Sequence, residues 1–123
     1  MSQRVLLIDD SPLQLRARKA VLRDAGFDVC IATTADGALA LLRSGSVGNS
    51  IATVVTDHVM PGVSGADFVK AIRKIRPQIP IIVITGLPGA ESEYEGLHIE
   101  FRHKPFHPSD LIGLVRRSMS EAA

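Results

Sequence analysis

The chain has 123 residues, 46% of them hydrophobic and 22% charged, and its 14 lysines and arginines against 13 acidic residues leave a formal net charge of +1. These values are typical of one soluble globular domain and give no electrostatic reason to expect a nucleic-acid or membrane partner. The N-terminus does not resemble a signal peptide, no apolar run is long enough to cross a membrane, and the single cysteine, Cys30, cannot form an internal disulfide. We therefore expect a cytoplasmic location.

Short runs rich in β-branched residues alternate five times with longer amphipathic stretches along the chain. The short runs predict strands at residues 4–9, 28–32, 52–56, 79–84 and 99–103. The first amphipathic stretch covers residues 11–25 and ends before Gly26, which predicts a helix. Its apolar residues at helical spacing are Leu13, Ala17, Ala20, Val21 and Leu22.

Two further helices are predicted from the residues that can cap their N-termini. Thr34 precedes one apolar stretch and Ser64 precedes another, and both side chains are favoured caps. Their apolar residues are Ala38, Leu39, Leu41 and Leu42 in the first, and Phe68, Val69, Ile72 and Ile75 in the second. A last helix is predicted at 108–119. Residues 44–50 predict a polar, flexible loop, and Pro61-Gly62 predict a turn.

Five strand–helix repeats in one small domain predict the α/β class: a parallel, doubly wound sheet with helices on both faces. The strand at 79–84 is almost purely apolar, as expected of a central parallel strand that is covered on both sides. Right-handed crossovers restrict the topology to a few strand orders, of which the flavodoxin-like order 2-1-3-4-5 is one.

Polar residues stand where four of these strands end. The first strand ends in Asp9 and Asp10, the third in Asp57, the fourth in Thr85, and the fifth leads to Lys104. Ligands of such sheets bind at the carboxyl ends of the strands, so these side chains are expected to converge. Three close carboxylates repel one another, and Mg²⁺ is a suitable counter-ion for oxygen ligands. A carboxylate beside that metal could accept a phosphoryl group, which a lysine and a hydroxyl could then bind.

Four segments together resemble the receiver domain of two-component response regulators. They are Val-Leu-Leu-Ile-Asp-Asp-Ser at 5–11, the stretch from Val54 to Gly65 with Asp57-His58-Val59-Met60-Pro61 at its centre, Ile-Val-Ile-Thr-Gly at 82–86, and Lys-Pro-Phe at 104–106. Each segment alone could be an ordinary strand end or surface residue, but their order and spacing fit the family. The resemblance covers essentially residues 1–123, with a core at about 4–119, and implies one flavodoxin-like domain of strand order 2-1-3-4-5.

The resemblance implies a role for each of these residues. Asp57 would be phosphorylated, and Mg²⁺ would be held by Asp9, Asp10, Asp57 and the backbone carbonyl of Val59. Thr85 and Lys104 would bind the phosphoryl group. Phe101 would be the aromatic switch residue, coupled to Thr85, and the Lys104–Pro105 peptide bond would be cis, an isomer that proline makes inexpensive.

The same resemblance implies a signalling domain that takes its phosphoryl group from a histidine kinase or a histidine phosphotransfer protein. Such a domain is not an enzyme beyond its own phosphorylation and dephosphorylation. The chain is expected to be either a stand-alone receiver or a receiver from a larger protein such as a hybrid kinase. The family places Val59 and Leu87 where they could position the water that hydrolyses the phosphorylated form.

The chain departs from the family between Thr85 and Phe101, where only Gly86 through Glu100 are available. Residues 90–95 are the only plausible helix there, so the fourth helix is expected to be short or irregular. The four histidines, at 58, 98, 103 and 107, lack metal-ligand spacing and are expected at the surface. Arg102, Arg116 and Arg117 are expected to form a solvated basic group.

Three other functions compete with the receiver interpretation. One is an interaction module that works without phosphorylation, which the complete set of acidic residues at the strand ends disfavours. A haloacid dehalogenase-type phosphatase would also use an aspartyl phosphate with Mg²⁺, but its nucleophile normally follows the first strand, and this chain has no room for a substrate cap. A flavin carrier on the same fold would need a phosphate-binding loop after the first strand, which the sequence lacks. The receiver interpretation is therefore preferred.

Overall fold

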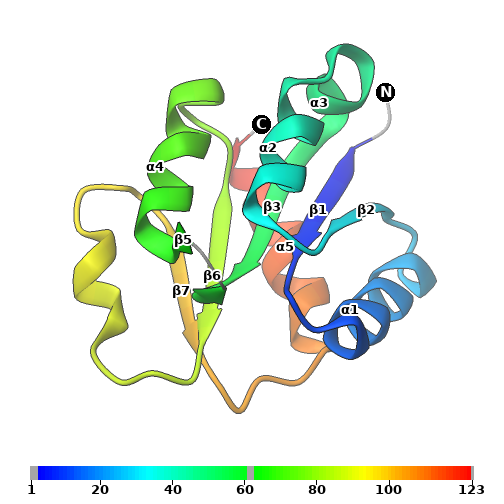
Figure 1. The fold of residues 1–123 in the computed structure, drawn as a ribbon. Coiled ribbons are helices and arrows are strands. Elements are labelled where there is room, and N and C mark those ends of the chain that lie inside the picture. Colours follow the sequence, from blue (N-terminus) through cyan, green and yellow to red (C-terminus); the bar gives the residue numbers. More distant parts are fainter. Residues whose placement is uncertain (1–2, 61–62, 123) are drawn as a thin grey trace.

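The computed structural model describes residues 3–60 and 63–122. Within them, five parallel strands form one sheet in the order β2-β1-β3-β6-β7 (Figure 1). The strands are β1 (Arg4–Ile8), β2 (Asp28–Ala32), β3 (Ile51–Asp57), β6 (Ile81–Thr85) and β7 (Glu100–His103). Counting these five strands alone, the order is 2-1-3-4-5, so the flavodoxin-like topology is confirmed.

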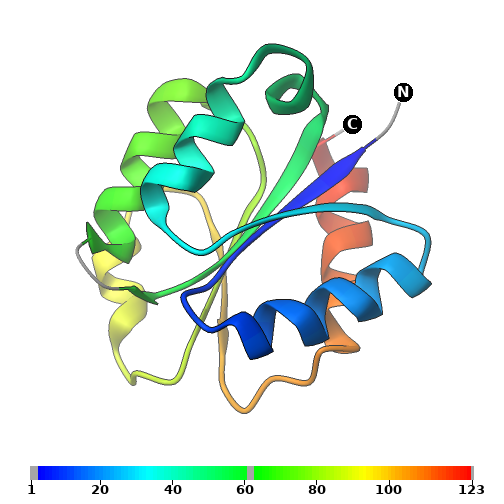
Figure 2. The same ribbon diagram turned by 45° about the vertical axis from the view of Figure 1, so that its right-hand side comes forward.

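Helices cover both faces of the sheet (Figure 2). On one face lie α1 (Pro12–Asp24) and α5 (Asp110–Ala122), and on the other lie α2 (Ala35–Arg43) and α4 (Gly65–Ile75). Because successive side chains of a strand point to opposite faces, Val5 and Leu7 of β1 pack toward α1 and α5, while Leu6 and Ile8 pack toward α2 and α4. Each face thus has its own hydrophobic core.

Side-chain caps fix the first turn of three helices. Thr34 Oγ1 accepts a hydrogen bond from the Gly37 amide at 3.0 Å, and Ser64 Oγ accepts one from the Asp67 amide at 3.1 Å. Ser11 Oγ accepts from the Gln14 amide at 3.3 Å. Each cap gives a hydrogen-bond partner to a first-turn amide that would otherwise lack one, and this stabilises the start of the helix at that residue. The caps predicted at Thr34 and Ser64 are confirmed.

The loop predicted at 44–50 is wrong, because α3 (Gly45–Ser50) is a short helix. Arg76, from a distant part of the chain, stabilises it by donating from Nη1 to the Gly48 carbonyl at 2.9 Å. Within the helix, Ser50 Oγ donates to the Val47 carbonyl at 2.6 Å. Gly48 is buried against the Leu42 carbonyl, where a larger side chain would collide with the backbone. Helix propensity alone could not have indicated these contacts.

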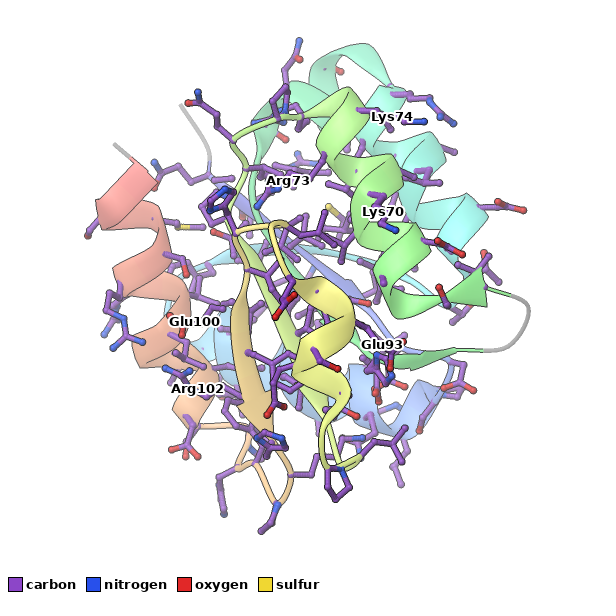
Figure 3. The ribbon with its side chains drawn as sticks, turned by 90° about the vertical axis from the view of Figure 1, so that its left-hand side faces the viewer. Lys70, Arg73, Lys74, Glu93, Glu100 and Arg102 are labelled. Carbon is purple, nitrogen blue, oxygen red and sulfur yellow. The ribbon has the colours of Figure 1, made fainter. Side chains whose placement is uncertain are left out.

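The segment between β6 and β7 holds a single 3₁₀ turn, η1 (Ala90–Tyr94), in place of a full fourth helix. This confirms the expectation of a short or irregular element at 90–95. Ala90 and Tyr94 are buried, so the turn packs inward with two side chains. The chain then returns to β7 past Arg73 of α4, whose guanidinium donates to the backbone carbonyls of Leu97 at 3.0 Å and His98 at 2.9 Å (Figure 3).

Two short strands that the sequence did not predict follow β3 along the chain. They are β4 (Val59–Met60) and β5 (Val63–Ser64), which pair antiparallel with each other. The turn predicted at Pro61-Gly62 lies outside the described residues. In the part of the chain that the structure describes, no helix combines the length and the apolar character needed to cross a membrane.

The buried stripe of α1 differs from the predicted one. It consists of Leu15, Arg18 and Leu22, whereas Leu13 is 72% exposed. The prediction assigned the buried face to the small and apolar residues of the stretch. Arg18 occupies a core position instead, and its ion-pair partner is Asp9, which directly follows β1.

Candidate functional site

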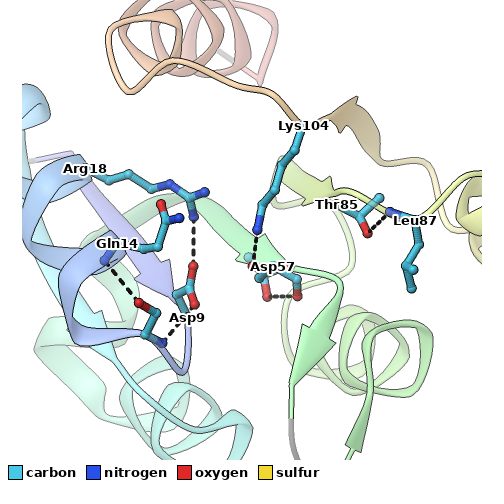
Figure 4. A network of polar contacts seen from close by, with 9 residues as sticks. Asp9, Gln14, Arg18, Asp57, Thr85, Leu87 and Lys104 are labelled. Carbon is cyan, nitrogen blue, oxygen red and sulfur yellow. Dashed lines mark hydrogen bonds and ion pairs between the residues drawn. The ribbon is translucent and has the colours of Figure 1, made fainter.

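The carboxyl edge of the sheet gathers the polar residues that the sequence placed at strand ends. Asp9 directly follows β1, Asp57 ends β3, Thr85 ends β6, and Lys104 directly follows β7. The Lys104 ammonium lies 2.9 Å from Oδ2 of Asp57, two side chains that are 47 positions apart in the sequence (Figure 4). Parallel strands bring their carboxyl ends to one edge, which is why residues so distant in sequence meet.

Asp9 is buried, and both of its carboxylate oxygens accept hydrogen bonds. Oδ1 accepts from the Ser11 amide at 2.9 Å, and Oδ2 accepts from Nη1 of Arg18 at 3.2 Å. Burial raises the pKa of Asp9 above its ordinary value, and the neighbouring negative charge of Asp57 also raises it. The Ser11 amide and the positive charges of Arg18 and Lys104 act in the opposite direction. Two buried carboxylates therefore lie within electrostatic range of each other, with a cation next to each.

The donor atoms suit a small divalent cation. Asp9 and Asp57 are buried, while Asp10, the next residue after Asp9, is exposed. Among the described residues, no group of three or more His, Cys, Asp or Glu side chains is arranged to hold a metal ion. Mg²⁺ commonly uses only one or two carboxylates together with water and phosphate oxygens, and that requirement is met here. Val59, whose carbonyl was expected to help, lies two residues beyond Asp57 in β4.

Thr85 and Lys104 are linked through the backbone. The Thr85 side chain is buried, and its Oγ1 accepts a hydrogen bond from the Leu87 amide at 3.1 Å. The Thr85 carbonyl accepts from the Lys104 amide at 2.7 Å, and the Lys104–Pro105 peptide bond is cis, as the resemblance implies. The hydroxyl and the ammonium are thus held at the ends of two neighbouring strands.

A chain of rings runs from the residue after Asp57 to the surface of β7. His58 contacts Tyr94 at 5.5 Å between ring centroids, Tyr94 contacts Phe101 at 5.6 Å, and Phe101 contacts His103 at 5.2 Å. His58 is buried, so its predicted surface position is wrong, whereas the other three histidines are exposed as expected. Phe101 is partly buried in this chain of rings.

Sequence reasoning missed Arg18, His58 and Tyr94. Arg18 gave a usable signal, because it stands three residues after Leu15 and four before Leu22, the spacing of a buried helix face. A charged residue at such a position needs a buried partner of opposite charge. His58 and Tyr94 gave no comparable signal, since their contact joins residues 36 positions apart.

Comparisons with known proteins agree with this geometry. A family model described as the response regulator receiver domain matches residues 5–116. The receiver domain protein (CheY-like) of Methanospirillum hungatei superposes with a TM-score of 0.88 at 25% identity, covering 99% of this chain and 97% of that one. The chemotaxis response regulator CheY4 of Vibrio cholerae superposes with a TM-score of 0.82 at 28% identity, covering 96% and 99% of the two chains.

One curated relative is the hydrogenase transcriptional regulatory protein HoxA of Cupriavidus necator, 32% identical over 94% of this chain and 24% of its own length. The DNA-binding response regulator MtrA of Mycolicibacterium smegmatis is 31% identical over 94% of this chain and 50% of its own. The chain thus spans between about a quarter and a half of the length of these relatives, so the similarity concerns one domain of each.

Proposed function

The chain belongs to the response regulator receiver domain family, and on that basis we propose that Asp57 accepts a phosphoryl group from a histidine kinase or histidine phosphotransfer protein. The observation that supports the proposal most directly is the 2.9 Å contact between Lys104 Nζ and Asp57 Oδ2 beside the buried Asp9. Residues 1–123 would form one such domain, with a core at about 4–119, and we propose a cytoplasmic location. The family match supports the receiver function over the phosphatase alternative.

In the proposed transfer, a carboxylate oxygen of Asp57 attacks the phosphorus of a phosphohistidine. The new O–P bond forms as the P–N bond breaks, and the electron pair of the broken bond stays on the imidazole of the donor. Lys104 already contacts the attacking carboxylate, so its ammonium can pair with the added phosphoryl oxygens. The Thr85 hydroxyl, at the neighbouring strand end, would donate a further hydrogen bond to them.

The negative charge at these strand ends supports a role for a divalent cation. A phosphoryl group brings negative charge to a site that already holds two buried carboxylates. When bound by Asp9, Asp10, Asp57 and the Val59 carbonyl, Mg²⁺ would supply positive charge against the phosphoryl oxygens. Asp9 and Asp57 would be its buried ligands, and Asp10 would reach it from the exposed side.

Phosphotransfer labelling tests the proposal. Incubation with a labelled phosphohistidine donor or with acetyl phosphate should label the parent protein only when Mg²⁺ is present, and Asp57→Asn should abolish the label. Asp24→Asn is the matched control, because Asp24 is an exposed aspartate at the end of α1. Label that persists in Asp57→Asn, or turnover of small phosphate esters by the parent, would refute the assignment.

A further inference from the structure

Arg18 is a buried charge that the proposed phosphoryl transfer does not use. It lies on the inward face of α1 between Leu15 and Leu22 and is only 3% exposed. Its guanidinium reaches the end of the neighbouring strand, where Nη1 lies 3.2 Å from Oδ2 of Asp9 (Figure 4). A buried guanidinium is costly unless it is paired, so Arg18 depends on Asp9 as much as Asp9 depends on Arg18.

This contact occupies the carboxylate that the family uses for its metal. Asp9 Oδ2 accepts from Arg18 and Oδ1 accepts from the Ser11 amide, while Asp57 Oδ2 is paired with Lys104. The two buried carboxylates are therefore each neutralised by a cation of the chain itself. A divalent ion that binds Asp9 must share it with the guanidinium or displace the guanidinium, and either arrangement brings two positive charges together in a poorly hydrated place.

We propose that Arg18 is a built-in competitor of the divalent cation, which holds Asp9 while the site contains no metal and weakens Mg²⁺ binding. The proposal rests on the proposed function, because it assigns Asp9 to the metal. Phosphorylation adds negative charge and would offset the repulsion between the guanidinium and the metal. In such a site, Mg²⁺ and the phosphoryl group favour each other's binding more strongly than they would without Arg18.

A purely structural role of Arg18 makes the opposite prediction. If the guanidinium only held Asp9 in place for the metal, its removal would leave Asp9 less well oriented and Mg²⁺ would bind more weakly. If the guanidinium competes with the metal, its removal leaves more of the negative charge of Asp9 and Asp57 unbalanced. Mg²⁺ then binds more tightly. The direction of the change in Mg²⁺ affinity therefore separates the two roles.

The experiment is a calorimetric titration of the unphosphorylated full chain with MgCl₂. Arg18→Leu and Arg18→Gln should each lower the Kd for Mg²⁺ by roughly tenfold, the effect of removing one nearby like charge. Arg18→Lys keeps the charge and should stay within about threefold of the parent. Arg16→Leu is the matched control, because it removes the same charge from an exposed position on the same helix and should leave the Kd unchanged.

Thermal unfolding with and without MgCl₂ provides a second measurement. Because Arg18→Leu leaves Asp9 buried without its guanidinium partner, this variant should unfold at a lower Tm than the parent when no Mg²⁺ is present. Arg18→Gln, whose side-chain amide can still donate a hydrogen bond to Asp9, gives the same comparison if leucine prevents folding. A larger Mg²⁺-induced rise in Tm for these variants than for the parent would support the proposal. An equal or weaker Mg²⁺ affinity in both charge-removing variants would overturn it.

Labelling of Asp57 separates this proposal from the one on which it rests. If the parent is labelled in saturating Mg²⁺ but loss of Arg18 does not tighten Mg²⁺ binding, the competitor role fails and the receiver function stands. If no protein binds Mg²⁺ and none is labelled, both proposals fail together.

Discussion

The hydroxyl of Tyr94 is hydrogen-bonded to Nδ1 of His58, the residue that directly follows Asp57. Glu93 approaches the same imidazole from the other side, with Oε2 3.6 Å from Nε2. These two contacts connect η1, the 3₁₀ turn that replaces a full fourth helix, to the end of β3, where the proposed phosphorylation site lies. We therefore expect a movement of His58 to shift η1 through these contacts with Tyr94 and Glu93.

Tyr94 is the only tyrosine of the chain, so its ionisation can be followed without interference. Burial, with smaller contributions from the charges of Glu93 and Asp57, raises the pKa of Tyr94 above its usual value. Tyrosinate absorbance near 295 nm should therefore appear at higher pH in the folded protein than in urea, where the pKa is about 10. Equal titration midpoints in the two states would contradict the buried position of the hydroxyl.

The sign of the stability change follows from the direction of this shift. Because the folded-state pKa lies above the unfolded one, the contribution of Tyr94 is fully present below a pH of about 10 and is lost as the pH rises from there through the folded-state pKa. Tyr94→Phe, which cannot ionise, should lose less stability over the same range. Urea unfolding at two pH values on either side of 10 makes the comparison.

Because Gly65 has no side chain, the Tyr94 hydroxyl can lie where a Cβ atom at position 65 would be. A Cβ at position 65 would collide with that hydroxyl and would lie 2.8 Å from the His58 carbonyl oxygen and 3.0 Å from His58 Nδ1. Gly65→Ala should therefore lower the free energy of unfolding by about 1–3 kcal/mol, the usual effect of overpacking. Urea unfolding measures the loss.

Two variants test the cause of that loss. Gly113→Ala is the control, because a Cβ at Gly113 in α5 meets nothing within 4 Å and alanine is favoured in a helix, so stability should stay equal or rise by up to about 1 kcal/mol. Adding Tyr94→Phe to Gly65→Ala should restore part of the loss, since it removes the atom nearest to the new methyl group. No difference between the two glycine variants would contradict the close packing described for Gly65.

The sequence could predict the sheet and most of the strand-end residues because both depend on local patterns. Five apolar runs and two capping residues were enough to place the strands and two helix starts. The helix at 45–50 was not predicted, since one of the contacts that stabilise it comes from Arg76, far along the chain. Arg18 was missed for a different reason: the apolar residues of α1 were assumed to mark its buried face, and Leu13 is exposed instead.

The Thr85 hydroxyl is expected to connect phosphorylation to Phe101. In the structure it accepts from the Leu87 amide at 3.1 Å, and Phe101 is partly buried against Tyr94 and His103. If the hydroxyl turns toward a phosphoryl oxygen, Phe101 can move into the space it leaves; the two states need differ by only a few kcal/mol. Beryllofluoride, a phosphoryl mimic, should shift the aromatic resonances of Phe101 in the parent.

Thr85→Ala should still be phosphorylated on Asp57 but should lose that response. Alanine removes the hydroxyl, which is the group that could follow the phosphoryl oxygen, together with the γ-methyl group of Thr85. Identical Phe101 resonances in the parent with and without beryllofluoride would exclude a coupling between phosphorylation and Phe101. An unchanged beryllofluoride shift in Thr85→Ala would show that a residue other than Thr85 provides the coupling.

Decay of the phosphorylated form depends on a water molecule in line with the bond between Asp57 and phosphorus. From the resemblance to the family we expect Val59 and Leu87 to lie where side chains could hold that water, and neither valine nor leucine can donate or accept a hydrogen bond through its side chain. Leu87 is 48% exposed on the loop that follows β6, and its backbone amide donates to the Thr85 hydroxyl. Gly86, the residue before Leu87, would leave a phosphoryl group on Asp57 accessible, but we expect access without orientation to add little to the rate.

We therefore expect the phosphorylated protein to persist for minutes to hours after the donor is removed. One positioning hydrogen bond that stabilises the transition state by about 1.4 kcal/mol speeds a step roughly tenfold. Val59→Asn and Leu87→Glu should each accelerate decay by about that factor, and the double variant by more than either. Leu13→Gln is the control, since it adds a polar group to an exposed apolar residue of α1. Loss of label within seconds from the parent would show that access, rather than orientation of the water, sets the rate.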